Sequence, residues 1–136
     1  MKEGFAYLPH TTDAYIEVNA RTLERAFEFA AQALFDTMCN LNSIEAAITE
    51  DIDAEGEDRI DLLYDWLEAL LLRFELQSKV YSKFTLSPIE KSDENLRLRG
   101  KIGGETYDRK KHGSKVEVKA VTYHNMTVAE GPLGIR

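Results

Sequence analysis

The residues of this chain best suited to chemistry lie toward its two ends. His10 and Asp13 follow a short apolar run near the start, and His112 and His124 lie near the end. Imidazole and carboxylate groups can bind metal ions and transfer protons. Loops that border strands can bring distant parts of a chain together on a rigid scaffold, so the segments around His10 and His124 are candidates for one shared site.

Asp13 has two interpretations, and the residues around it leave both open. Its carboxylate and the hydroxyl groups of Thr11 and Thr12 are oxygen donors of the type that Ca²⁺, Mg²⁺ and Mn²⁺ prefer. An Asx turn, in which the carboxylate bonds to nearby backbone, explains the same residue without a ligand, and the residues alone favour this turn. His10 has no second histidine at helical spacing, so a zinc helix motif is absent.

Three basic or glycine-rich features could contact an anion, but each has a simpler interpretation. Lys119 lies in the middle of an alternating run, where a lysine usually faces solvent and would contact an anion only if its face lined a cleft. The pair Gly103–Gly104, before Glu105, lacks the longer glycine motifs of nucleotide-binding folds, so a turn or bulge is favoured. Residues 109–111 (Arg-Lys-Lys) are expected to form a solvated hairpin tip.

Motifs of nucleophilic catalysis are absent. No serine has the sequence context of a nucleophile elbow. The single cysteine, Cys39, follows the apolar periodicity of a helix and is expected to be a packed thiol. Asp58, Asp61 and Asp65 recur three and four residues apart, and a solvated helix face is favoured there over an acidic ridge for a basic partner. A serine or cysteine hydrolase is therefore unsupported.

Composition predicts one domain over residues 1–136, in a reducing compartment. A single cysteine allows no internal disulfide, and neither a membrane-spanning apolar run nor a signal peptide is recognised, so a cytoplasmic protein without membrane association is expected. The net charge is −7 and unevenly spread: residues 1–90 hold 7 basic and 18 acidic residues, whereas residues 91–124 hold 9 and 5. This charge argues against tight direct binding of nucleic acid.

Apolar periodicity predicts an α+β fold. Two amphipathic helices pack on a mostly antiparallel β-sheet in this interpretation, as a sandwich-like single domain, and a split βαβ arrangement ranks second. Thr22 is the expected N-cap of the first helix, and Trp66 and Leu67 are expected to anchor the second helix on the sheet. Helices are expected at 22–41 and 57–74, an acidic turn at 53–58, and strands at 5–8, 15–20, 43–52, 80–86, 96–102, 116–123 and 126–128.

Five stretches, in order and spacing, resemble the archease family over nearly the whole chain. The stretches at residues 62–71 (LLYDWLEALL) and 119–124 (KAVTYH) are the most specific of them. The other three are residues 10–13 with 16–18, residues 26–34, and Gly104–Glu105 with Asp108 and His112.

The resemblance implies a function for the chain. Archeases are accessory factors that activate the GTP- and Mn²⁺-dependent RNA ligase of tRNA splicing, promoting its guanylylation and multiple turnover. They have also been described as chaperone-like modules for a tRNA cytosine methyltransferase. An RNA ligase, and alternatively a tRNA methyltransferase, are thus the implied protein partners, and the chain is implied to have no catalysis of its own. A small metal-dependent phosphoesterase is the competing enzyme hypothesis, which would require His10, Asp13 and His124 to converge on one ion.

The resemblance also implies a metal site and a functional surface. Asp13 becomes a metal ligand in this reading, for Ca²⁺, Mg²⁺ or Mn²⁺. Archeases usually end in an apolar strand that closes with an aspartate of the same metal site, whereas this chain ends in the sequence GPLGIR, as a truncated C-terminal strand would. The implied functional surface comprises His10, Glu105, His112, Lys119 and His124.

Overall fold

The computed structural model describes residues 3–8, 15–115, 118, 130–131 and 134–135. Within them the chain is a mixture of helices and antiparallel strands, which confirms the predicted α+β class. The elements in chain order are β1 (Gly4–Leu8), β2 (Tyr15–Asn19), α1 (Leu23–Met38), the 3-10 turn η1 (Leu41–Ser43), β3 (Ile48–Gly56), α2 (Arg59–Gln77), β4 (Lys79–Leu86), β5 (Glu90–Ser92), β6 (Asn95–Thr106), α3 (Arg109–His112), β7 (Glu130–Gly131) and β8 (Gly134–Ile135).

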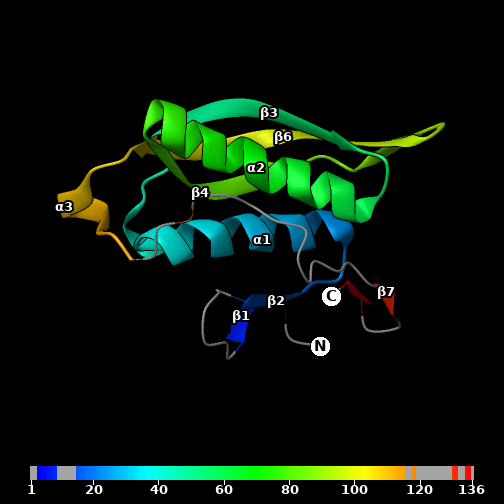
Figure 1. Ribbon diagram of the computed structural model, residues 1–136, viewed down its shortest axis with the longest axis horizontal. Helices are drawn as coiled ribbons and strands as arrows, with labels where there is room; N and C mark the ends of the chain where they lie inside the picture. Colours follow the sequence, from blue (N-terminus) through cyan, green and yellow to red (C-terminus); the bar gives the residue numbers. More distant parts are fainter. Residues whose placement is uncertain (1–2, 9–14, 116–117, 119–129, 132–133, 136) are drawn as a thin grey trace.

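The central sheet has the strand order β3-β6-β4, and β5 also pairs with β6. All of these pairings are antiparallel. Helix α2 packs beside β3 and helix α1 beside β4, so the two long helices cover one face of the sheet (Figure 1). The hairpin β1-β2 lies on the side of α1 away from the sheet (Figure 1).

Helix α1 begins where the sequence predicts and ends earlier. The side chain of Thr22 accepts a hydrogen bond from the Arg25 amide at 3.1 Å, which confirms it as the N-cap. The predicted end at residue 41 is wrong, because the helix closes at Met38 and Asn40 starts a separate 3-10 turn by accepting a bond from the Asn42 amide. Cys39, at the end of α1, is buried as expected, and burial raises the pKa of its thiol.

Helix α2 is attached to the core through Trp66. The Trp66 side chain is completely buried, its indole N–H donates to the Phe27 carbonyl of α1 at 2.9 Å, and its ring meets Phe84 of β4 edge-on. Leu67 is half-buried and packs against the same core. These contacts confirm the predicted role of both residues. The helix runs past the predicted residue 74 to Gln77, where Ser78 in the left-handed conformation caps it.

The acidic segment before α2 is a strand, which corrects the predicted strand at 43–52 and turn at 53–58. β3 runs from Ile48 to Gly56, and its apolar Ile52 and Ala54 are buried while the acidic residues that alternate with them, Asp51, Asp53 and Glu55, are exposed. Alternation therefore continues through the acidic residues, whose side chains face solvent and whose backbone pairs with β6. High charge density suggested a turn, but charge on the open face of a sheet is compatible with a strand.

Two further predicted turns are regular structure: Gly103–Gly104 lies in a strand, and residues 109–111 lie in a helix. β6 continues through Gly103 and Gly104, and the irregularity in pairing lies in the facing strand β4, between Tyr81 and Lys83. A Cβ atom at Gly104 would overlap the backbone carbonyl oxygen of Val80 and crowd Tyr81, so a side chain is excluded there by close approach of the two strands. Residues 109–111, predicted as a hairpin tip, lie in the short helix α3, which Asp108 caps by accepting from the Lys110 amide.

The other strand predictions divide into two groups. Strands expected at 5–8, 15–20, 80–86 and 96–102 correspond to β1, β2, β4 and β6. Strands expected at 116–123 and 126–128 lie outside the described residues, apart from residue 118, and remain predictions. Of the described helices, none combines the length and apolarity needed to cross a membrane.

Candidate functional site

The predicted functional residues divide between the described and undescribed parts of the chain. His10, Asp13, Lys119 and His124 lie outside the described residues, so their proximity remains a prediction. Glu105 and His112 are described, and their side chains are in direct contact: His112 Nε2 lies 2.8 Å from Glu105 Oε2. The sequence grouped these two residues only through the family resemblance, and the structure places them at one end of the sheet, where β6 leads into α3.

His112 is enclosed by protein on every side. Its side chain is 0% exposed, and its ring stacks on Tyr107 with a centroid separation of 5.7 Å. Nδ1 accepts a hydrogen bond from the Asp108 amide at 2.9 Å, which leaves Nε2 as the nitrogen that donates to Glu105. Both ring nitrogens are therefore occupied. Within the described structure, neither ring nitrogen of His112 is left free to bind another group.

Glu105 is the centre of a small polar cluster. Its carboxylate accepts from the backbone amide of Glu45 at 2.9 Å, from His112 and from the Lys111 ammonium at 2.9 and 3.0 Å. The Glu45 amide, with His112 and Lys111, lowers the pKa of Glu105 to about 2. Lys111 also lies 3.3 Å from Glu45, and the pKa of Lys111 is raised, chiefly by its hydrogen bond to Glu105. The carboxylate is thus held in its ionised form.

This cluster fastens the α3 segment to the end of α1. The His112 carbonyl accepts from the Asn40 amide, the Gly113 carbonyl accepts from the Tyr107 hydroxyl, and the Lys115 amide donates to the Met38 carbonyl. Sequence reasoning missed Lys111 and Glu45, because residues 109–111 were expected to be solvated. The sequence offered one signal for Lys111, which is that it directly precedes His112. It offered none for Glu45, whose contact with Lys111 depends on the tertiary structure.

The three aspartates at the start of α2, which were expected to form a solvated helix face, also accept hydrogen bonds from backbone amides. Asp58 caps the helix by accepting from the Asp61 amide at 2.8 Å. Asp61 accepts from the Glu57 amide and Asp65 accepts from the Glu55 amide, at 3.2 and 3.0 Å, so α2 side chains satisfy backbone donors in and beyond β3. Within the described part of the chain, no group of three His, Cys, Asp or Glu side chains is arranged to hold a metal ion.

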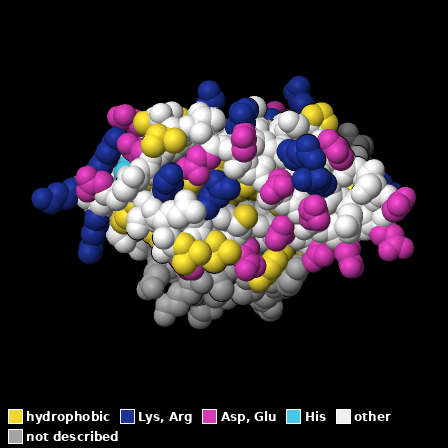
Figure 2. Space-filling view, turned by 90° about the horizontal axis from the view of Figure 1, so that it is seen from above, with side chains coloured by type: hydrophobic (Ala, Val, Ile, Leu, Met, Phe, Trp, Pro, Cys, Tyr) yellow, Lys and Arg dark blue, Asp and Glu magenta, His cyan; other side chains and the backbone are white. Residues whose placement is uncertain are grey.

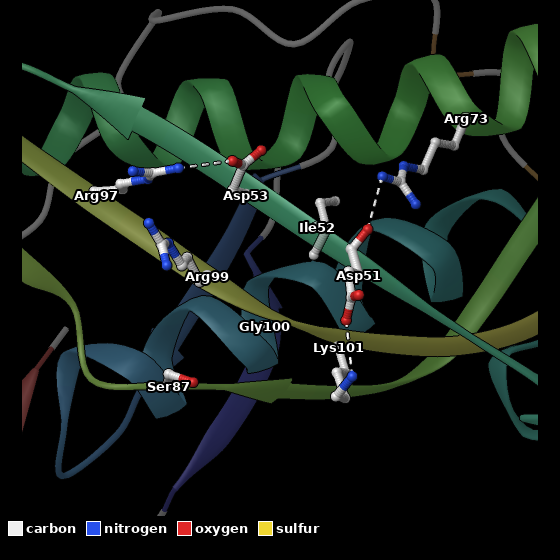
Figure 3. Close-up of a pocket in the computed structure, with 9 residues that line it drawn as sticks. All are labelled: Asp51, Ile52, Asp53, Arg73, Ser87, Arg97, Arg99, Gly100 and Lys101. Carbon is white, nitrogen blue, oxygen red and sulfur yellow. Dashed lines mark hydrogen bonds and ion pairs between the residues drawn. The ribbon is translucent and has the colours of Figure 1, made fainter.

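A shallow hollow of about 590 Å³ lies on the sheet face opposite the helices. It contains none of the residues singled out from the sequence as a candidate site. Figure 3 shows Arg99 pointing into it from β6, between Arg97 and Ser87, and Figure 2 shows basic and acidic side chains interspersed over the molecular surface. The residues that line the hollow are Asp51, Ile52, Asp53, Arg73, Ser87, Arg97, Arg99, Gly100 and Lys101.

Comparison with known proteins identifies close relatives over almost the whole chain. Residues 5–136 match the Archease protein family (MTH1598/TM1083). The chain is 45% identical over 125 residues to Protein archease of Pyrococcus furiosus, covering 92% of this chain and 87% of that protein. It is 42% identical over 121 residues to Protein archease of Methanopyrus kandleri, covering 89% and 86%.

A solved structure has the same fold. The solution structure of Methanobacterium thermoautotrophicum protein 1598 superposes with a TM-score of 0.81, at 35% sequence identity, and the match covers 97% of this chain and 92% of that one. The antiparallel sheet and its two long helices are therefore an arrangement shared with that protein.

Proposed function

This chain belongs to the archease family, and from that premise we propose that it is an accessory factor that activates the RNA ligase of tRNA splicing. In this proposal it promotes guanylylation of the ligase and its multiple turnover, and it has no catalytic turnover of its own. The observation that carries the proposal is the family match over residues 5–136, supported by 37–45% identity to several proteins named archease.

The described part of the structure supports a positioning role for Glu105 and His112. Glu105 and His112 hold α3 and residue 115 against α1, and the chain continues from there toward Lys119 and His124. A bonded polar cluster built on a buried histidine favours one arrangement of the segments it joins. We infer that the cluster fixes where the chain enters the 119–124 stretch, which would carry surface contacts to the ligase.

A divalent ion at Asp13 is part of the same proposal. Asp13 and the neighbouring threonines Thr11 and Thr12 offer oxygen donors, which suit Ca²⁺, Mg²⁺ or Mn²⁺. One carboxylate does not complete the coordination of such an ion, so the remaining donors would come from water, from elsewhere in the chain or from the ligase. A bound ion would supply positive charge beside phosphate groups.

The acidic character of the chain suits docking to a basic, RNA-binding enzyme. The net charge is −7, and the acidic residues are concentrated in the first 90 residues. Opposite charges on the two surfaces would steer their encounter and raise the association rate, with a strong dependence on salt. We therefore expect stimulation of the ligase at limiting protein concentration to weaken as ionic strength rises.

Three reaction mixtures test the proposed function against its alternatives. The protein is incubated with cleaved RNA, GTP and Mn²⁺ alone, with the ligase, and separately with a tRNA cytosine methyltransferase. Acceleration only in the presence of the ligase supports the proposal. Turnover by the repurified protein alone would support a phosphoesterase, and a change in methyltransferase activity without any effect on the ligase would support the chaperone-like module.

A pair of charge-matched variants tests the role of Asp13. Asp13→Asn replaces a carboxylate with a neutral amide at nearly constant shape, and Asp93→Asn makes the same change at an exposed turn residue. We expect Asp13→Asn to lose divalent-ion binding and ligase stimulation while its thermal unfolding without added metal stays near that of the wild type. Full stimulation by Asp13→Asn would return this residue to the Asx-turn interpretation.

A further inference from the structure

The hollow on the open face of the sheet carries an excess of positive charge in an acidic protein. Four of its lining side chains are basic and two are acidic, whereas the whole chain has a net charge of −7. The basic members include Arg97, Arg99 and Lys101, at alternate positions of β6, so their side chains share one face. The register places Lys101 opposite Asp51 and Arg99 opposite Asp53.

Among Arg97, Arg99 and Lys101, Arg99 is the one whose side chain has no partner within the described structure. Its side chain is exposed and has no hydrogen bond or ion pair with any part of the chain that the structure describes (Figure 3). Its guanidinium can therefore form a bidentate pair of hydrogen bonds with an oxyanion without breaking a side-chain bond that the described structure contains. The Ser87 side chain is exposed at the edge of the same hollow, and its hydroxyl is a second donor.

The basic residues on either side of Arg99 are held only weakly. Arg97 is 3.3 Å from Asp53 and 3.7 Å from Glu55, and its Nε has no hydrogen-bond partner within the described structure. The ion pair between Lys101 and Asp51 is short, at 2.8 Å, but both side chains are mostly exposed. Exposed pairs of this kind contribute little and exchange readily. A ligand that carries several negative charges can therefore displace these carboxylates and bind Arg97 and Lys101 together with Arg99.

We propose that this row, Arg97-Arg99-Lys101, binds the phosphate groups of a single-stranded polynucleotide. Alternate residues of a strand lie roughly 6.6 to 6.8 Å apart, a spacing of the same order as that of adjacent phosphates on an extended strand. The hollow is shallow and not enclosed, which suits a chain that crosses it better than a small enclosed ligand. Asp51 and Asp53 oppose binding, so we expect a weak contact, in line with the expectation from composition that nucleic acid is not bound tightly.

Fluorescence anisotropy of a labelled ten-nucleotide oligouridylate, with the whole chain and no ligase, tests this proposal separately from the proposed function. Two to three neutralised phosphates predict a slope of log binding constant against log salt of about −1.4 to −2. Arg99→Gln should weaken binding several-fold and reduce the slope by about 0.7. Lys110→Gln removes one exposed charge from α3 and should have a much smaller effect.

A variant that should bind the oligonucleotide more tightly provides a second test. Asp53→Asn removes a carboxylate that competes for the row, and should tighten binding more than Glu75→Gln, which removes an exposed charge from α2. Equal effects of Arg99→Gln and Lys110→Gln, or no binding at low salt, would overturn the proposal. Inorganic phosphate is titrated as a separate probe, and phosphate binding that needs Arg99 without oligonucleotide binding would also overturn the polynucleotide assignment.

Discussion

Replacing Trp66 with alanine should remove a large part of the stability of this protein. The side chain is completely buried between the helices and the sheet, and packs edge-on against Phe84 with a centroid separation of 6.1 Å. Truncating a buried tryptophan to alanine costs about 3–5 kcal/mol, because apolar contact is lost and a cavity remains. The lost indole bond to the Phe27 carbonyl adds about 0.5–1.5 kcal/mol.

Two matched variants separate these contributions. Trp66→Phe keeps an aromatic ring beside Phe84 but removes the indole N–H, so we expect a loss of about 1–2 kcal/mol, smaller than for alanine. Leu76→Ala removes an apolar side chain of α2 that is 78% exposed, and should change the free energy of unfolding by no more than about 0.5 kcal/mol. The comparison thus tests burial and not hydrophobicity alone.

Urea unfolding followed by far-UV circular dichroism is the suitable assay. Trp66 is the one tryptophan of the chain, so tryptophan fluorescence would be lost in Trp66→Ala and Trp66→Phe and could not report on their unfolding. The predicted order of stability is wild type and Leu76→Ala together, then Trp66→Phe, then Trp66→Ala. A midpoint for Trp66→Ala equal to that of Leu76→Ala would refute the packing of α2 on the core described above.

Three further substitutions test particular contacts. The pKa of Glu105 is lowered from its ordinary value of 4.5 to about 2, so the stabilisation from its ionised carboxylate is present above pH 4.5 and is lost as the pH falls toward 2. Glu105→Gln should therefore be less stable than the wild type at pH 7 and should lose less stability over that acid range in urea titrations. Asp58→Ala removes the N-cap of α2 and should cost about 0.5–2 kcal/mol in the same assay. Gly104→Ala should destabilise by at least about 1–3 kcal/mol because its Cβ would overlap β4 backbone. The loss should exceed that of Gly113→Ala, where the backbone (φ 75°, ψ −178°) disfavours a side chain but no atom lies within 4 Å of the added Cβ; the reverse order would contradict the strand pairing at Gly104.

Local sequence signals predicted the long helices and most of the described strands. Thr22 is followed by apolar residues at helical spacing, and Trp66 lies on the apolar side of the second pattern, so both could be assigned without tertiary information. The acidic run at residues 53–58 misled the prediction, since the exposed residues of a strand can be as highly charged as those of a turn. Pairing with Arg97 and Lys101 of β6 stabilises that strand, and these partners lie more than 40 residues away.

The candidate site was less accessible to sequence reasoning than the fold. His112 and Glu105 were identified through the family resemblance, but only the structure shows that the histidine is buried and bonded through both ring nitrogens. The Glu45 amide that stabilises the Glu105 carboxylate is 60 residues away in the chain. Asp13, His10, Lys119 and His124 remain predictions, because they lie outside the described residues.

The most direct test of the account is the rate of the guanylylation step of the ligase, measured in a single turnover with labelled GTP and Mn²⁺. The account predicts that adding this protein raises the rate constant for transfer of the guanylate to the ligase, and that the protein itself acquires no label. Asp93→Asn should stimulate as well as the wild type. An unchanged rate constant at saturating protein, with the protein folded and the ligase active, would contradict the proposed function.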